Sequence, residues 1–415
     1  MRRRRLIVAC ALLGGALWVV SPAAGASTSR AERVKVADYF TKDDIARARR
    51  YRAPAYAFSF LALAAQIAAV LVLGLAWGTR RLASLADRTA GQRWWLQAIV
   101  LALAVSFILA LVDLPFGAAR EALDRAWGLS TRNAGGFLGD FVKGFAFQAV
   151  LAVIVALAFF WITRTLPRGW PVAAAGAAVV LTFVLSMLWP LVYEPLFNKF
   201  TPVEPELRAR IVAIGEKSGV RIGSVVIADA SRRTTRQNAY VSGLGSTKRV
   251  VLYDTLLDKS TPKEVDLVVA HEFGHVKHND VVKGTAFGAL GAVAGVVVMW
   301  LLLSSATVKS YLGISGASDV RALPFLVMFI TVAGLLTLPV GNWYSRRIEA
   351  DADRHAVHVT RDIQTAVQVE VSLARDNISD IEPNLVIRWI FFSHPAPLER
   401  IALQQAEAAK LGLTP

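Results

Sequence analysis

The sequence predicts a mainly helical protein built into a membrane, with a smaller polar part that contains a short β-sheet. Apolar residues make up 55% of the 415 residues and charged residues only 19%. The mean hydropathy is positive, which is unusual for a water-soluble chain of this length. The apolar residues also gather in runs long enough to cross a bilayer, which takes about 20 residues as a helix.

Six apolar runs are long enough to span the membrane: residues 55–77, 94–114, 144–162, 171–193, 285–303 and 323–340. None carries the polar stripe at helical spacing that a soluble core helix presents to water. Tryptophan or tyrosine stands at several of their ends, as is typical at membrane interfaces. The runs therefore predict a multi-pass integral protein of the cell membrane, in contact with the lipid bilayer.

The first 26 residues form a seventh, shorter apolar run behind four arginines. This run ends in an Ala-Gly-Ala sequence at 24–26, which is similar to a signal-peptidase site. The segment is therefore either a cleaved export signal or a retained first transmembrane helix. Cys10, within the run, is the only cysteine of the sequence, which excludes intrachain disulfides and cysteine ligands to a metal.

The net charge of +15 raises the question of nucleic-acid binding. The excess is scattered over the leader and the short loops and forms no basic stripe with interleaved aromatic residues. Basic loop ends beside anionic lipid explain it, and we expect no nucleic-acid partner. The arginines at 80–93 favour a cytoplasmic location for the loop after the first span, whereas those at 47–52 favour the reverse orientation.

The distribution of apolar and polar segments divides the chain into three parts. Residues 1–26 are the leader or first transmembrane helix, and residues 27–193 form an N-terminal membrane domain with four clear spans. Residues 194–415 form a polar domain into which two transmembrane helices are inserted, at about 285–303 and 323–340.

The polar domain begins with three short runs of β-forming residues, at 224–228, 237–242 and 249–253. Glycine and aspartate residues separate these runs, so a small β-meander is predicted. A helix is then predicted to begin after Thr261. Thr261 and Glu264 have the spacing of a capping box, and a proline occupies the first helical position.

This helix carries the sequence His271-Glu272-Phe273-Gly274-His275, which fits H-E-x-x-H. Residues four apart lie on one helical face, so both imidazoles can bind a single zinc ion. Glu272 then stands beside the metal, where it can take a proton from zinc-bound water. The alternative is two helix histidines beside a chance glutamate. We interpret the pattern as a zinc metalloendopeptidase with one Zn²⁺ per chain and a peptide or protein substrate.

A zinc site of this kind takes a third protein ligand. His278 lies off the face shared by the two motif histidines, and we expect it to be exposed. Glu349 and Asp353 are four residues apart on a predicted helix after the last span, whereas Asp351 points elsewhere. One of the two carboxylates could bind zinc while the other orients a ligand histidine. From these residues alone, a solvated acidic helix is the default interpretation.

Several segments together resemble the type I CAAX prenyl endopeptidases (Ste-type, HtpX-like) and their bacterial relatives. The family pattern is H-E-x-x-H, then S-R-x-x-E-x-x-A-D, then a late S-H-P with a following arginine. This sequence contains, in that order, HEFGH, SRRIEADAD and SHPAPLERI. The segments KDDIARARRYRAPAYAFSF, YEPLFNKFTPVEPELRARI and QNAYVSGLGSTKRVVLYDTLL are also similar, so the resemblance covers most of the chain.

The resemblance implies a ring of seven helices around a water-filled chamber, with a zincin-like catalytic domain at its edge. Seven spans require the N-terminal run to be retained. The resemblance also implies Glu349 as the third zinc ligand and Asp353 as a catalytic partner of the site. His394 is implied to act near the scissile carbonyl, in catalysis and in substrate binding. Asn238 is implied to bind substrate. Arg400 matches the late arginine, with a role in the substrate site or in an ion pair with Asp353.

Other functions remain alternatives at this point. A transporter would carry charges or broken helices within its spans, and Asp113 is the one clear acid near a span, where Pro115 is expected to end the helix. A catalytically silent scaffold is contradicted by the complete set of expected catalytic residues. For the protease itself, CAAX-box protein processing follows from the resemblance. The excess of arginine over lysine suggests a GC-rich bacterial genome, where quality control of membrane proteins with no prenyl substrate is an alternative.

Overall fold

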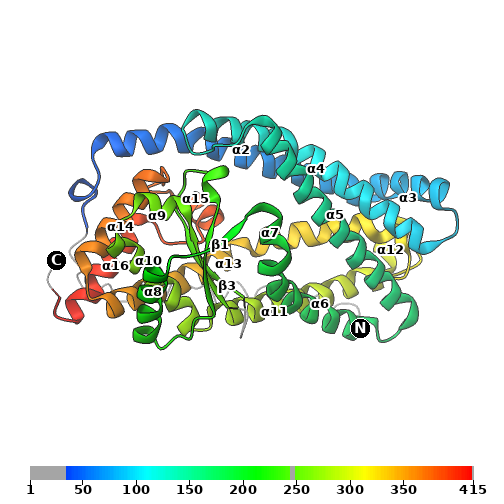
Figure 1. Cartoon of the computed structure of the whole chain (residues 1–415). Coiled ribbons are helices and arrows are strands. Elements are labelled where there is room, and N and C mark those ends of the chain that lie inside the picture. Colours follow the sequence, from blue (N-terminus) through cyan, green and yellow to red (C-terminus); the bar gives the residue numbers. More distant parts are fainter. Residues whose placement is uncertain (1–33, 244–247, 414–415) are drawn as a thin grey trace.

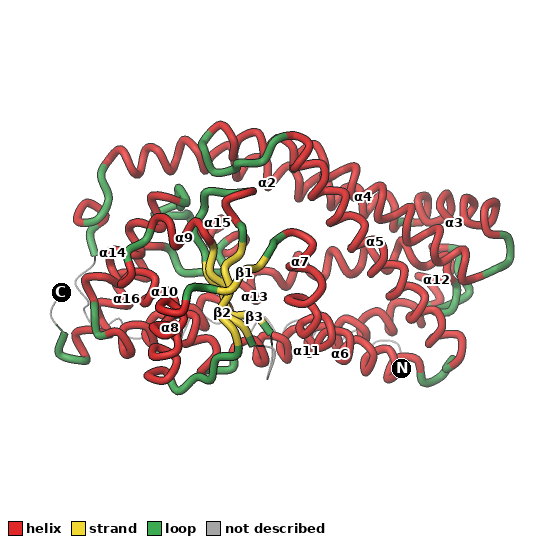
Figure 2. Tube along the Cα trace, viewed as in Figure 1, coloured by secondary structure: helices red, strands yellow, loops and turns green. Residues whose placement is uncertain are grey.

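The computed structural model describes residues 34–243 and 248–413, so the predicted leader at 1–26 lies outside the described residues. The molecule is elongated, with the long apolar helices gathered towards one end and the polar domain at the other (Figure 1). A small sheet is the main non-helical element, and it lies within the polar domain on the side of the long helices (Figure 2).

Six helices in the described part of the chain are long and apolar enough to cross a membrane, and each overlaps one predicted run. Val172 and Leu336 on these helices have relative exposures of 80% and 74%. Because such exposure to water is unfavourable, lipid must cover these faces, and the prediction of a multi-pass membrane protein is confirmed. The six helices are α2 (Lys42–Gly74), α4 (Trp94–Ala126), α5 (Ala134–Thr165), α6 (Trp170–Leu188), α11 (Asp280–Ser304) and α13 (Leu323–Thr360).

These helices form a closed ring in the order α2, α4, α5, α6, α11, α13 and back to α2. Gly74 of α2 allows the ring to close against α13, because a Cβ at this position would lie 2.4 Å from the Cβ of Met328. The ring encloses a cavity of about 1660 Å³. The predicted ring with a chamber is therefore confirmed, with six helices among the described residues.

Two expectations about the first loops were wrong. The arginine-rich segment after the first span is not a loop but helix α3 (Ala76–Ala90), which packs against α4. Helix α4 does not end at Pro115 but continues to Ala126. Proline removes one backbone hydrogen bond, and a membrane helix tolerates this where neighbouring groups compensate.

The sheet contains four strands in the order β1-β2-β4-β3. The three predicted runs are confirmed as strands, but their order is not that of a meander. Strand β4 lies between β2, to which it is parallel, and β3, to which it is antiparallel. The connection from β2 to β3 is too long for a tight hairpin. It passes the position that β4 later fills, so β3 becomes an edge strand. The strands are β1 (Phe200–Pro202), β2 (Ser224–Ala228), β3 (Ala239–Ser242) and β4 (Arg249–Tyr253).

The remaining helices surround the sheet or connect the spans. In the polar domain these are α7 (Glu194–Phe197), α8 (Pro205–Ser218), α9 (Asp254–Lys259), α10 (Pro262–Lys277), α14 (Ile363–Asp376), α15 (Leu385–Phe391) and α16 (Pro397–Lys410). Helix α12 (Ala306–Leu312) lies between α11 and α13. Single turns are η1 (Val36–Asp38), the π-helical η2 (Trp189–Tyr193), η3 (Ala230–Arg232) and η5 (Val320–Ala322).

Helix α10 begins where the capping box predicts. The backbone N–H of Thr261 donates to the Glu264 carboxylate at 2.7 Å, and the Thr261 hydroxyl accepts from the Glu264 N–H. Val269 and Phe273 are fully buried in the core of the polar domain. Positions two residues away are turned by about 200° around a helix, so burial of this apolar face turns the face of His271 away from the core.

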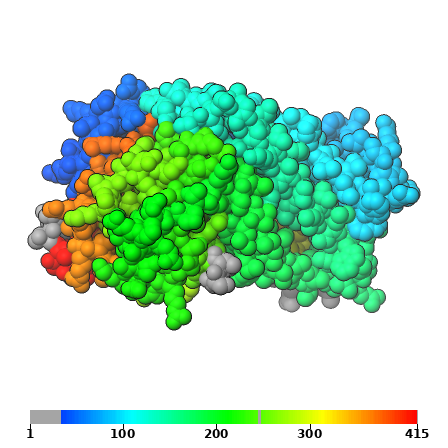
Figure 3. Space-filling view, viewed as in Figure 1, coloured from blue at the N-terminus to red at the C-terminus, as the bar shows by residue number. Residues whose placement is uncertain are grey.

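The first span is fixed to the C-terminal part of the chain. Figure 3 shows the start of α2, in blue, beside the orange segments that contain α14. The Arg52 side chain donates to the carbonyl of Ile378 at 2.6 Å, and the Tyr56 hydroxyl donates to Asp380 at 3.0 Å. These contacts anchor the loop between α14 and α15 on the membrane ring.

Candidate metal centre

Three of the predicted residues come together between α10 and α13. His271, His275 and Glu349 each offer one ligand atom, and these atoms lie within 4.8 Å of one another. The two histidines come from successive turns of α10, and Glu349 comes from the part of α13 beyond its apolar stretch. No other such group of three is present in the described ranges 34–243 and 248–413.

Close contact between the two helices makes this convergence possible. A Cβ at Gly274 would lie 2.8 Å from the Cα of Ala352 and 3.1 Å from the Cβ of His355. Only glycine therefore fits between the two ligand histidines of α10 at this separation. Gly274 occupies a position that the H-E-x-x-H pattern leaves open, and packing against α13 explains why it is a glycine.

The donor atoms of the three side chains are close enough to share one metal ion. Nε2 of His271 lies 3.3 Å from Oε2 of Glu349, and Nε2 of His275 lies 3.7 Å from Oε1. Ligands at bond lengths of about 2.1 Å around tetrahedral zinc are about 3.4 Å apart. Oε2 of Glu349 is buried without a hydrogen-bond partner, which a cation would supply. Two imidazoles and a carboxylate are also a donor set that zinc prefers.

Each ligand histidine has a carboxylate on its other ring nitrogen. Nδ1 of His271 lies 2.9 Å from Oδ1 of Asp353, and Nδ1 of His275 lies 3.1 Å from Oδ2 of Asp280. Such contacts fix the orientation of the ring and direct Nε2 to the metal. Sequence reasoning missed Asp280, which is buried at the start of α11. Asn279 before it adopts a left-handed backbone conformation (φ 56°) between α10 and α11, and no local sequence pattern predicts this turn.

Arg400 lies behind Asp353 in this arrangement. Its Nη2 and Nε contact the two carboxylate oxygens of Asp353 at 2.5 and 2.9 Å, and its Nη1 contacts Glu370 at 3.0 Å. Burial alone would lower the pKa of Arg400, but the two carboxylates outweigh it and raise this pKa. The expected ion pair between Arg400 and Asp353 is present. Glu370 was not anticipated, because α14 carries no motif that connects it to the site.

Glu272 and Asn238 lie on the elements that border the centre. Glu272 is half-buried on α10, and burial raises the pKa of its carboxyl group. Asn238 is exposed and directly precedes the edge strand β3, which packs against α10. Its backbone carbonyl accepts from the N–H of Tyr253.

His394 reaches the centre from the turn between α15 and α16. Its Nε2 lies 3.3 Å from Oε1 of Glu349, and its Nδ1 lies 3.0 Å from the hydroxyl of Ser393. The His394 side chain is 58% exposed. This imidazole therefore faces both the Glu349 carboxylate and the surrounding solvent.

Two other residues considered from the sequence lie outside the centre. Asp351 is exposed and pairs with Arg354 of its own helix, as expected for a residue that points elsewhere. His278 was expected to be exposed but is half-buried, with its ring 5.9 Å from that of His355. His278 is half-buried because α10 and α13 approach each other closely. The spacing of residues in the sequence did not indicate this approach.

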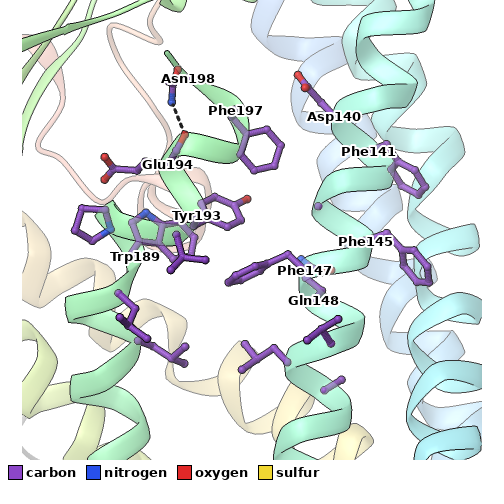
Figure 4. A pocket seen from close by; sticks show the side chains of 18 of the residues that line it. Asp140, Phe141, Phe145, Phe147, Gln148, Trp189, Tyr193, Glu194, Phe197 and Asn198 are labelled. Atoms are coloured by element: carbon purple, nitrogen blue, oxygen red, sulfur yellow. Dashed lines mark hydrogen bonds between the residues drawn. The ribbon is translucent and has the colours of Figure 1, made fainter. Parts of the chain in front are cut away.

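The edge strand next to the centre also borders the chamber. Tyr240 and Ser242 of β3 line the cavity together with aromatic residues of α5 and η2. Figure 4 shows Phe147, Trp189 and Tyr193 pointing towards a common space. The rings of Trp189 and Tyr193 stack at 3.9 Å, and Phe147 meets Tyr193 edge-on at 5.0 Å. The chamber thus opens towards the strand beside the metal centre.

A buried ionic contact ties this strand to the chamber wall. Arg249 of β4 and the hydroxyl of Tyr240 both contact Oε2 of Glu194, at 2.7 and 3.0 Å. Arg249 also donates to the carbonyl of Pro190 at 2.6 Å. In the π-helical turn this carbonyl would accept from residue 195, but Pro195 has no N–H to donate. Arg249 therefore supplies the missing donor and joins the sheet to the end of α6.

The ring, the chamber and a two-histidine, one-carboxylate cluster together define a multi-pass membrane metallopeptidase. The family model described as "Peptidase family M48" matches residues 204–408. A second model, "CAAX prenyl protease N-terminal, five membrane helices", matches residues 28–199. The two models together cover both the membrane ring and the polar domain.

Known proteins similar to this chain come from both bacteria and eukaryotes. A protein named "CAAX prenyl protease 1 homolog" from Oryza sativa subsp. japonica is 30% identical over 72% of this chain and 71% of its own length. "Uncharacterized metalloprotease YhfN" from Bacillus subtilis is 28% identical over 75% of this chain and 74% of its own. The crystal structure of S. mikatae Ste24p superposes with a TM-score of 0.76 at 22% identity, over 89% of this chain and 90% of that chain.

The chain belongs to peptidase family M48, within the branch that contains the CAAX prenyl proteases. It is a membrane metallopeptidase, and the expectation of this family from the sequence is confirmed. The structural similarity to Ste24p extends the agreement in fold over nearly the whole chain.

Proposed function

We propose that this protein is a zinc metalloendopeptidase in which His271, His275 and Glu349 hold one zinc ion. The convergence of these three groups beside an edge strand that borders the chamber is the observation that carries the proposal. Membership in a metallopeptidase family supports it independently.

The chemistry follows from the residue types around the centre. Zinc held by these ligands would act as a Lewis acid, polarising a peptide carbonyl and lowering the pKa of a water molecule to about 7. Glu272, adjacent to the first ligand, takes the proton of the attacking water and then delivers it to the leaving amine. His394 donates a hydrogen bond to the carbonyl oxygen as negative charge develops there.

The residues behind the ligands hold them in place. Asp353 accepts from Nδ1 of His271, which keeps Nε2 free for the metal. Arg400 is committed to Asp353 and Glu370. We therefore assign Arg400 to positioning of the site, in preference to the substrate contact that the sequence had suggested.

A substrate peptide would bind as an added strand along β3. This strand is at the edge of the sheet and packs against the helix that carries Glu272. Backbone hydrogen bonds to an edge strand position a peptide without demanding a particular sequence. The exposed side chain of Asn238, directly before β3, is suited to contact the peptide near the scissile bond.

Substrates with an apolar group suit the chamber. Its wall beside β3 is aromatic, and the rice relative is named a CAAX prenyl protease 1 homolog. We therefore propose a CAAX-protease-like activity on peptides that carry an apolar modification near the cleavage site. Quality-control cleavage of unmodified membrane proteins is the alternative.

Purified protein in detergent tests both levels of the proposal. Bound zinc should be stoichiometric, and a quenched fluorescent peptide with a prenylated C-terminal cysteine should be cleaved. The Glu272→Gln variant should retain zinc and lose cleavage. The same peptide without its prenyl group separates the two substrate classes, because equal cleavage of both peptides would favour quality control. A zinc-loaded protein that cleaves neither peptide would contradict the proposed function.

A further inference from the structure

One face of α13 carries more than the metal ligand. Asn342, Arg346, Glu349 and Asp353 follow one another at spacings of four, three and four residues, which places them in one stripe along the helix. All four side chains are buried. Glu349 and Asp353 serve the metal centre, whereas the other two contact a different element.

Asn342 and Arg346 hold the C-terminal end of helix α15. The amide nitrogen of Asn342 donates to the carbonyls of Trp389 and Ile390 at 3.0 and 2.8 Å. The guanidinium of Arg346 donates to the carbonyls of Arg388 and Phe392 at 3.2 and 2.6 Å. These four hydrogen bonds come from only two buried side chains.

The last carbonyls of a helix have no partners within it and need donors from elsewhere. Helix α15 has only seven residues, none of which is buried, so its own packing determines its position weakly. Phe391 does stack on Tyr56 of α2, with ring centroids 5.8 Å apart. The polar contacts from α13, however, reach the end of α15 that leads into the His394 turn.

This end of α15 determines where His394 lies. Phe392 is two residues before His394, and its carbonyl makes the shortest of the four contacts. His394 then approaches Glu349 on the same stripe of α13, with Nε2 and Oε1 3.3 Å apart. The metal-binding carboxylate and the catalytic imidazole are therefore both placed by one helix.

We propose that Asn342 and Arg346 are positioning residues for catalysis, which set the location of His394 relative to Glu349. The inference rests on the proposed function, in which His394 stabilises the developing oxyanion. Preorganised donors act only when they are held close to the productive geometry, and small displacements reduce rates strongly.

A double-mutant cycle tests this proposal. Arg346→Lys keeps the charge, but lysine Nζ ends one bond short of Nη1, the atom that makes both contacts. We therefore expect kcat to fall by about 10-fold to 100-fold, with KM and zinc content nearly unchanged. His394→Ala should lower kcat by roughly 100-fold to 1000-fold. In the His394→Ala background, Arg346→Lys should cost less than a further factor of about two, because its effect passes through His394. Additive losses would overturn the proposal.

Arg347→Lys is the matched control. Arg347 is the next residue, is exposed, and lies over the ring of Trp343 at 4.1 Å. Among the described residues, no hydrogen bond or ion pair joins its side chain to α15. This variant should retain the wild-type kcat. A loss equal to that of Arg346→Lys would attribute the effect to general disturbance of α13 and would contradict the proposal.

Hydrogen exchange supplies a readout that does not depend on catalysis. Amides of residues 386–396 should exchange faster in Arg346→Lys and Asn342→Ala than in wild-type or Arg347→Lys protein, whereas amides of α10 should be unchanged. Unchanged exchange at 386–396 would overturn the positioning role. A wild-type protein without peptidase activity would contradict the proposed function instead, and the exchange data would still decide whether α13 holds α15.

Discussion

Nδ1 of His275 lies 3.1 Å from the carboxylate of Asp280, the third residue after the end of α10 at Lys277. Asp280 is buried at the first position of α11. The first residue of α11, the helix after the H-E-x-x-H sequence, thus places its carboxylate against the second histidine of that sequence. This arrangement matches the contact between His271 and Asp353, so the imidazoles of both proposed ligands contact a carboxylate.

The first prediction concerns this contact. Asp280→Ala should weaken zinc binding by about 10-fold to 100-fold, because loss of the partner frees the His275 ring and lowers its basicity. Asp280→Asn should lose less, since its amide oxygen still accepts from Nδ1. Competition with a chelating zinc indicator measures the affinity. Lys283→Gln, which removes the other charge near Asp280, is the control, and an unchanged affinity in Asp280→Ala would exclude the orienting role.

A second prediction tests the role of Glu349 as the third zinc ligand. Glu349→Ala should lose stoichiometric zinc at micromolar free metal, because two histidines alone leave the site with too few ligands. Metal analysis after gel filtration measures this loss. Asp351→Ala should keep both zinc and activity, since Asp351 is exposed and pairs within its own helix. Full metal retention by Glu349→Ala would remove Glu349 from the ligand set.

The third prediction concerns the contact of α10 with α13. In Gly274→Ala, the added methyl group would lie 2.8 Å from the Cα of Ala352, and the helices must separate. We expect a loss of about 1–3 kcal/mol in stability and weaker zinc binding, because Glu349 moves away from the histidines. Thermal unfolding in detergent, with and without zinc, measures both effects. Gly284→Ala in α11, where a Cβ meets nothing within 4 Å, should be tolerated, and equal stability of the two variants would disprove the packing argument.

A fourth prediction addresses orientation in the membrane. Ser84 in α3 and Glu216 in α8 are both exposed. The two helices lie towards opposite ends of the molecule (Figure 1) and are separated along the chain by the three spans α4, α5 and α6. Arginines at 80–93 surround Ser84, and moving each charge across the membrane costs about 2.3 kcal/mol per 100 mV. An impermeant thiol reagent on intact cells should therefore label Glu216→Cys and spare Ser84→Cys.

Replacement of Cys10 by serine removes background in that experiment. The reverse labelling would place the metal centre on the cytoplasmic side, and the arginines at 47–52 would then dominate the orientation. Labelling of both positions would contradict the arrangement of spans.

The sequence alone determined the features that depend on neighbouring residues. Continuous apolar runs predicted all six spans, because a helix in lipid must be apolar over its whole length. The capping box at Thr261 predicted the start of α10, since both partners lie within one turn. The spacing of His271 and His275 predicted a shared helical face for the same reason.

Other features came from packing between distant segments, and no local sequence pattern indicated them. The order of strands in the sheet depends on how the chain crosses between β2 and β3, so the predicted meander was wrong. Asp280 reaches His275 only because the backbone turns at Asn279. Arg346 is the arginine of the S-R-x-x-E pattern, but its contacts and those of Asn342 could not be predicted, because the carbonyls of α15 that they bind lie more than 40 residues later.

The metal centre shows the division most clearly. The sequence alone determined that two histidines share a face of one helix, and that Glu349 and Asp353 share a face of another. Only the tertiary structure decided that these two faces meet, because that depends on the close approach at Gly274 and on the ring of spans that fixes α13. Local periodicity is a property of a few adjacent residues, whereas contact between faces is decided by the packing of the whole chain.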